Sequence, residues 1–154
     1  MATKLNFTAK AVAIERNIPK FLGIAAKDAQ VHFQKGFDNQ GFTDENLQTW
    51  KPRKGQIRSL GASVRSRLPN TKKTLTKTGA LKRSIRIMNS GSRRIRIVSD
   101  LPYSAIHNDG LMGRAWGRHS FKMPKRQFIG NSRILERRTM AKGVAIFQTA
   151  LLNG

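Results

Sequence analysis

The segment LKRSIRIMNSGSRRIRIVSD, residues 81–100, constrains the fold of this chain more than any other part. Isoleucines alternate with other residues on both sides of a turn-forming run, Asn-Ser-Gly, at residues 89–91. These isoleucines are Ile85, Ile87, Ile95 and Ile97. Alternation with a period of two on both sides of a turn predicts a β-hairpin. One face of this hairpin then presents isoleucines to a core, and the other face is basic.

The basic face of the predicted hairpin, with one neighbouring lysine, consists of Lys82, Arg86, Arg94 and Arg96. The whole chain has 30 Lys and Arg against 8 Asp and Glu, a formal net charge of +22. Such an excess favours a polyanionic partner, either nucleic acid or a strongly acidic protein surface. Cations gathered on one sheet face repel one another unless a polyanion lies across them. A solvated arginine face, of the kind that protects edge strands from aggregation, is the alternative.

The first long helix is predicted over residues 17–37, where Asn17 can cap and Pro19 suits the first turn. Its apolar residues form a face wider than one small sheet would cover. Part of this face is therefore expected to lie at a subunit interface. The residues predicted for that interface are Phe21, Leu22, Ile24 and Phe33. A helix buried on both sides within one core is the alternative.

A second long helix is predicted at the end of the chain, after a cap at Asn131 or Ser132. A third strand is predicted near Gln127–Ile129. Together these elements indicate an α+β fold in one domain, residues 1–154, with a small antiparallel sheet (the hairpin plus a third strand) packed against long N- and C-terminal helices.

A long basic loop or insertion is predicted at about residues 38–77, with a short helix possible within 57–68. Trp50 lies in this stretch. Its ring could stack on a ligand, but we favour an anchor that pins the loop to the core.

The segment SDLPYSAIHNDG, residues 99–110, contains the only tyrosine and invites a catalytic interpretation. The chain has no cysteine, no G-x-S-x-G motif and no phosphate-binding or dinucleotide fingerprint. A metal site from His107, Asp109 and His119 matches no known ligand spacing, and residues 51–154 lack the paired carboxylates of a metal-dependent nuclease. We therefore expect no catalytic, cofactor-binding or metal-binding residue. Instead, Tyr103 is expected to pack, and His107 to bond to backbone in one helical turn closed by a glycine.

Transport signals are not expected in this chain. No apolar run approaches the roughly 20 residues of a membrane span, and the first residues lack the pattern of a signal peptide. The sequence therefore predicts a soluble chain that is not exported and has no membrane partner.

Four segments in this order resemble the phage virion-morphogenesis family, the small tail-completion or neck proteins of tailed bacteriophages. They are GFTDENLQTWKPR (41–53), TGALKRSI (78–85), SDLPYSAIHNDG (99–110) and MPKRQFIG (123–130). The matching segments fall within residues 17–150, which is most of the chain. The residues in these motifs that are expected to shape the fold are Trp50, Tyr103, His107, Pro124 and Phe128.

The resemblance implies a structural virion protein, not an enzyme, that needs no cofactor and forms a homo-oligomeric ring at the neck. Sixfold symmetry is favoured, and a twelvefold ring is the alternative. The implied partners are head connector or adaptor proteins, tail terminator or tail tube proteins, and packaged DNA in the lumen, bound without sequence preference. The protein would pass from the host cytoplasm into the virion. A cellular RNA- or DNA-binding protein of ribosome-associated type is the rival, although no RRM, KH or helix-turn-helix signature is present.

Overall fold

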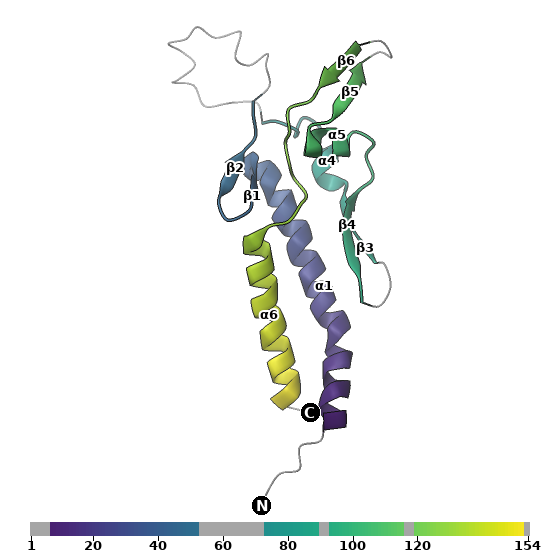
Figure 1. Cartoon of the computed structure of the whole chain (residues 1–154), viewed down its shortest axis with the longest axis vertical. Helices are drawn as coiled ribbons and strands as arrows, with labels where there is room; N and C mark the ends of the chain where they lie inside the picture. Colours follow the sequence, from purple (N-terminus) through teal and green to yellow (C-terminus); the bar gives the residue numbers. More distant parts are fainter. Residues whose placement is uncertain (1–6, 53–72, 90–92, 116–118, 153–154) are drawn as a thin grey trace, which may run out of the picture.

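Two long helices form the axis of the protein in a computed structural model that describes residues 7–52, 73–89, 93–115 and 119–152 (Figure 1). Helix α1 spans Phe7–Asn39, and α6, Arg133–Leu152, runs back beside it in the opposite direction. The helices meet where Gly143 of α6 lies against the ring of Phe21. That ring also packs on Phe147, with 5.6 Å between ring centroids. The predicted N- and C-terminal helices are confirmed.

Helix α1 begins earlier than its local signals predicted. Asn17 and Pro19 lie in its interior, and Nδ2 of Asn17 donates to the carbonyl oxygen of Ala13 at 2.8 Å, so its side chain caps no helix end. Residues 7–16 include several alanines, which favour helix and extend it through the proline. The interpretation of Asn17 as a cap and of Pro19 as a first-turn residue was therefore wrong. Pro19 disturbs the hydrogen bonding of only one turn and does not mark the start of the helix.

In the described ranges, three antiparallel hairpins and two short helices lie along the C-terminal half of α1 and beyond its end (Figure 1). The hairpins pair β1 (Gly41–Thr43) with β2 (Leu47–Thr49), β3 (Ile85–Asn89) with β4 (Ile95–Ser99), and β5 (Met112–Ala115) with β6 (His119–Lys122). The short helices are α4, Ala80–Arg83, and α5, Ser104–Asp109. The α+β class and the hairpin predicted within residues 81–100 are confirmed. The short helix considered within residues 57–68 lies outside the described residues.

The third strand predicted near Gln127–Ile129 is wrong, and residues 123–128 form no strand pairing. The backbone N–H groups of Phe128 and Ile129 donate to Oδ1 of Asn108, at 2.9 and 3.0 Å. One side-chain oxygen thus accepts the bonds that a neighbouring strand would otherwise accept. Strands form instead at β1–β2 and β5–β6, where glycine and polar turn residues conceal any alternation of apolar residues.

The core lies where the end of α1 meets the first hairpin, α4 and the segment that leads into α6. Its buried members are Phe33, Phe37, Phe42, Trp50, Leu81, Ile85 and Phe128. Phe37 is fully buried, and its ring centroid lies 5.2 Å from that of Trp50 and 5.4 Å from that of Phe128. Aromatic pairs at such distances add to the stabilisation from burial. This cluster therefore fixes three segments that are distant in sequence.

Helix α6 is capped by its own serine and by the first hairpin. Oγ of Ser132 accepts a bond from the N–H of Leu135 at 3.3 Å and donates to the carbonyl oxygen of Thr43 at 2.9 Å. Oδ1 of Asp44 accepts a bond from the N–H of Arg133 at 2.7 Å. The predicted serine cap is confirmed, and Asp44 holds the β1–β2 turn on the helix start.

Candidate functional site

The β3–β4 hairpin separates an apolar face from a basic one, as the sequence predicted. In its register Arg86 pairs with Val98, and Met88 pairs with Arg96, so these even-numbered residues share one face. Arg94, directly before β4, continues the same alternation. On the other face Ile85 is fully buried and Ile97 packs on the core. The hairpin therefore turns its arginines away from α1.

Two of the four cations predicted for this face are held in ion pairs. Lys82 lies on α4, and its Nζ is 2.8 Å from both carboxylate oxygens of Asp38. Arg86 is paired with Asp100. No carboxylate among the described residues pairs with Arg94 or Arg96, and both side chains are exposed. We call Arg94 and Arg96 the arginine pair; it carries the uncompensated charge of the hairpin.

The acidic residues of the chain are nearly all engaged in contacts within the subunit. Five of them form ion pairs with Lys or Arg: Glu15, Asp28, Asp38, Glu45 and Asp100. Asp44 caps α6, and Oδ1 of Asp109 accepts a bond from Nδ2 of Asn108 at 2.8 Å. Of the 8 acidic residues in the sequence, Glu136 is left without such a contact in the described ranges. A second copy of this chain thus offers few carboxylates to neutralise the basic surface.

Trp50, Phe128 and Pro124 all stand in the motifs on which the family resemblance rests. Trp50 is buried, and its Nε1 donates to the carbonyl oxygen of Gln127 at 2.7 Å. Phe128 packs beside it on Phe37. The indole therefore joins the end of the first hairpin to the segment before α6, the anchoring position rather than a ligand-stacking one. Pro124 lies nearer the surface, on the wall of a cavity.

Arg126 is a buried cation that the sequence reasoning missed; only 5% of its surface is exposed. Its Nε donates to the carbonyl oxygen of Lys51 at 2.9 Å, and its backbone N–H donates to the carbonyl oxygen of His107 at 2.8 Å. These bonds hold the end of the first hairpin, α5 and the segment before α6 together. The sequence did contain a signal that Arg126 is buried. It lies two residues before the apolar Phe128, and alternate residues of an extended segment share a face.

Asn108 is the second residue that the sequence reasoning missed. It follows His107 in α5 and binds the segment before α6 through the two bonds to its Oδ1. An asparagine in a helical turn normally indicates a local cap or turn. Nothing in the local pattern shows that this one bonds to residues about twenty positions away.

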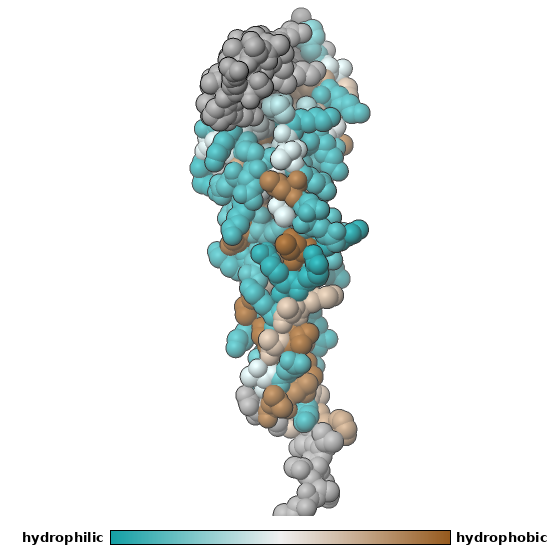
Figure 2. Space-filling model, turned by 90° about the vertical axis from the view of Figure 1, so that its left-hand side faces the viewer, coloured by the Kyte–Doolittle hydropathy of each residue, from teal (hydrophilic) through white to brown (hydrophobic). Residues whose placement is uncertain are grey.

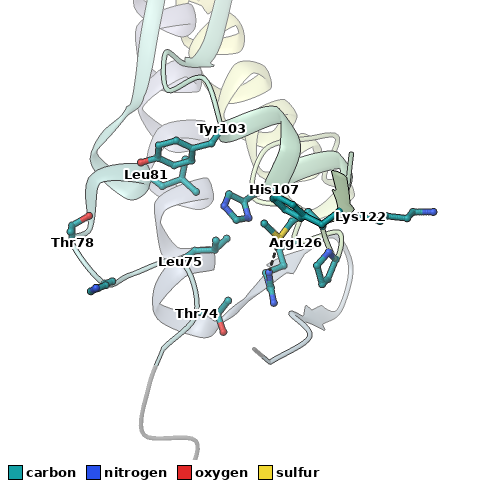
Figure 3. A pocket seen from close by; sticks show the side chains of 12 residues that line it. Thr74, Leu75, Thr78, Leu81, Tyr103, His107, Lys122 and Arg126 are labelled. Carbon is teal, nitrogen blue, oxygen red and sulfur yellow. Dashed lines mark hydrogen bonds between the residues drawn. The ribbon is translucent and has the colours of Figure 1, made fainter. Parts of the chain in front are cut away.

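Tyr103 and His107 line a cavity of about 550 Å³ beside α5 (Figure 3). Their rings meet edge to face at 6.0 Å. The predicted helical turn is confirmed as α5 and is closed by Gly110 at φ 71°. Tyr103 packs on one side only, since 39% of it is exposed. Within the described ranges, no three His, Asp or Glu side chains gather in a way that could hold a metal ion.

The four residues predicted for a subunit interface lie in different environments. Phe33 is in the core of the subunit, and Phe21 is covered by α6. Leu22 lines an apolar groove of about 410 Å³ between α1, β4 and α6, and Ile24 is half-buried. Their role at an interface stays a prediction. Phe33, however, is not on the surface of a single subunit.

The outer face of α6 exposes large apolar side chains. Met140 is 70% exposed and Val144 is 55% exposed. Figure 2 looks at the molecule from the side of α6 and shows apolar groups over the lower half, below a largely hydrophilic upper half. Because Met140 also lines the groove beside Leu22, this face continues that groove as one exposed apolar surface.

His32 joins α1 to the first hairpin in a neutral state. Burial lowers the pKa of His32 from its ordinary 6.5; Arg138 and Lys35 add to this, and the bond to Thr43 opposes it. Its Nε2 donates to the carbonyl oxygen of Thr43 at 3.0 Å, and its Nδ1 lies 3.5 Å from Nη2 of Arg138 and accepts from it. A neutral imidazole with its proton on Nε2 satisfies both contacts.

This small, basic protein combines an aromatic core that joins distant segments, a basic hairpin and exposed apolar helix faces. In the family comparison, residues 33–144 match the model of the phage virion morphogenesis family. Because this match covers more than half of the chain, the protein belongs to that family, whose members have structural and assembly roles in phage virions. The resemblance seen in the sequence is confirmed.

The other comparisons add no relative: no curated protein and no solved structure matches this chain. Among the helices of the described ranges, none has the length and apolarity needed to cross a bilayer.

Proposed function

We propose that this protein forms a ring at the neck of a tailed phage, completes the tail and joins it to the head connector. Packaged DNA passes through the lumen of the ring. Six copies are favoured, and twelve are the alternative. Family membership supports a role in the virion. The observation that carries the finer proposal is the arginine pair, Arg94 and Arg96, exposed and uncompensated on a face held away from α1.

Contact with DNA explains a basic face that has no base-reading motif. Arginine contacts to phosphate oxygens position a duplex without reading its sequence, and they release counterions, so affinity depends on salt rather than on sequence. Because seven of the eight acidic residues are engaged within the subunit, the counter-charge for this face comes from a different molecule. An acidic surface of a connector protein is the alternative partner for the same face.

Ring formation requires two different patches that fit each other on neighbouring copies, because the contact is head-to-tail. The apolar groove beside Leu22 is one such patch. Met140 lines this groove and Val144 extends it along α6, so the complementary patch lies elsewhere on the subunit. Head connector or adaptor proteins would bind one side of the ring, and tail terminator or tail tube proteins the other. Assembly would take place in the host cytoplasm before the protein enters the virion.

The proposal is tested by a cryo-EM map of assembled particles and by the solution mass of the purified full chain. We expect a ring of six or twelve copies at the neck, with the β3–β4 hairpins at the lumen. Density for this chain elsewhere in the particle would refute the neck assignment. A monomer in solution that binds RNA tightly, and is missing from particles, would favour the cellular RNA-binding alternative.

The interface prediction has its own test in particle assembly. Ile24→Asp, at a half-buried position, is expected to give a folded subunit that cannot complete particles. Phe33→Asp is the contrast, because it places a charge in the core and is expected to unfold the subunit. Circular dichroism reports the fold, and complementation of a phage lacking the gene reports assembly. If Ile24→Asp also unfolds the chain, Ile24 belongs to the internal packing of the subunit and the interface lies elsewhere.

A further inference from the structure

The cavity beside α5 is not used by the proposed ring or by DNA contact. It has a volume of about 550 Å³, within the range of sites that bind ligands. Its apolar wall is formed by Leu75, Leu81, Phe121, Met123 and Pro124. Figure 3 shows the rings of Tyr103, directly before α5, and His107 of α5 beside this space. Hydrocarbon and aromatic walls of this kind favour an apolar side chain as the occupant.

The charged residues around this cavity are all basic. Buried Arg126 and exposed Lys77 and Lys122 line it, and no Asp or Glu is among the described residues that line it. The guanidinium of Arg126 is fixed by its bonds to the carbonyl oxygens of Lys51 and Pro52. Lys122 is exposed and extends away from the cavity in Figure 3, so its ammonium adds to the positive potential around the cavity. Charge complementarity therefore selects an occupant that brings carboxylates.

We propose that this cavity binds an apolar side chain, aromatic or branched, from an acidic segment of a neighbouring virion protein. The apolar side chain enters between Leu75, Phe121 and Tyr103. Flanking carboxylates of the same segment lie against Lys77 at the rim. This inference rests on the proposed function, because it assigns one of the protein contacts that a neck subunit needs.

The chemistry of the wall distinguishes this occupant from the alternatives. A DNA phosphate gains nothing from the hydrocarbon of Leu75, Leu81 and Met123. A second copy of this chain is also disfavoured, because seven of its eight acidic residues already bind or cap groups within the subunit. Two aromatic rings at the cavity, Tyr103 and Phe121, are 39% and 38% exposed and have surface left to bury.

The test is calorimetric titration of the full chain with two acidic peptides and a duplex. The first peptide has a central Phe between runs of alternating Asp and Glu, and the second has Gly in place of Phe. We expect the Phe peptide to bind at least about tenfold more tightly, because burial of one aromatic side chain supplies that difference. The ratio should persist at high salt, since apolar burial is not screened. A short duplex DNA should not compete with the Phe peptide for the cavity.

Two variants separate the cavity from general attraction between charges. Thr78→Trp, at an exposed position on the cavity wall, fills the space and should reduce the Phe-to-Gly ratio to about one. Lys77→Gln should weaken both peptides more than Lys27→Gln, which removes the same charge from the exposed surface of α1. Thermal unfolding of each variant verifies its fold.

Equal binding of the Phe and Gly peptides would overturn the inference, and so would an unchanged ratio in folded Thr78→Trp. Competition by duplex DNA for the cavity would assign it to nucleic acid instead. These outcomes do not bear on the ring at the neck, which the particle map decides. If the map refutes the ring while the Phe peptide still binds in the cavity, only the identity of the neighbouring protein is lost.

Discussion

Replacing Arg94 and Arg96 by Gln removes the uncompensated charge of the β3–β4 face while leaving its apolar face intact. If both residues contact phosphate, the slope of log K against log salt for duplex DNA should fall in magnitude by about 1.8, because each neutralised phosphate contributes about 0.9. Arg86→Gln should change the slope less than either of them, because Asp100 already neutralises Arg86. Sequence preference should stay unchanged, since phosphate contacts carry no sequence information.

The assay is fluorescence anisotropy with a labelled duplex over a series of salt concentrations. Lys20→Gln with Lys27→Gln is the matched control, because it removes two exposed charges from α1 and leaves the hairpin unchanged. Each variant should keep its thermal stability within about 1 kcal/mol, the usual range for exposed charges. An unchanged slope in the Arg94 and Arg96 variant, or an equal change in the control, would refute contact between this face and phosphate.

Three outcomes concern stability and are measured by urea unfolding. The free energy of unfolding should fall as pH drops from 6.5 through the lowered pKa of His32, because the unfolded chain takes up the proton first; His32→Gln should flatten this dependence. Asn108→Ala leaves two backbone donors without their acceptor and should cost about 1–3 kcal/mol, whereas Asn108→Asp keeps an acceptor and should cost less. Gly143→Val places Cβ 2.9 Å from the ring of Phe21 and should cost about 1–3 kcal/mol, but Gly23→Ala meets no atom within 4 Å and should stabilise α1 by up to about 1 kcal/mol. The His32 argument would be contradicted by a free energy of unfolding that does not change with pH. The other two would be contradicted if Asn108→Asp is as destabilising as Asn108→Ala, or if Gly143→Val leaves the free energy of unfolding unchanged.

The parts of the fold that could be predicted are those written in local periodicity. Ile85 and Ile97 alternate with arginines over a short distance, and this alternation fixed both the hairpin and the side on which the arginines lie. The caps at Ser132 and Gly110 are equally local signals. Local signals failed at Pro19, because the helix formers on both sides of it continue the helix through a residue that usually marks an end.

The parts that could not be predicted depend on partners far away in the sequence. The charge of Lys82 is compensated by Asp38, 44 residues earlier, so its place on the basic face could not be judged from its neighbours. Arginine is usually a surface residue. Arg126 is buried because its Nε donates a hydrogen bond to the carbonyl oxygen of Lys51, 75 residues earlier in the chain. The third strand failed for the same reason, since Asn108 supplied the acceptor that a strand was expected to provide.

The proposed contact of the arginine pair with DNA and the proposed contact of the cavity beside α5 with a neighbouring protein should differ in their dependence on salt. Three acidic residues of α1, Glu15, Asp28 and Asp38, each pair with a cation on a different neighbouring segment. These exposed pairs each contribute little, so high salt should leave the fold intact. The same salt should release DNA from the arginine pair, because that contact depends on counterion release. Binding in the cavity beside α5 depends mainly on apolar burial and should persist. When assembled necks are washed with increasing salt, the DNA should therefore be released before the neighbouring protein. Release of the DNA and the neighbouring protein at the same salt concentration would mean that the cavity contact is electrostatic as well.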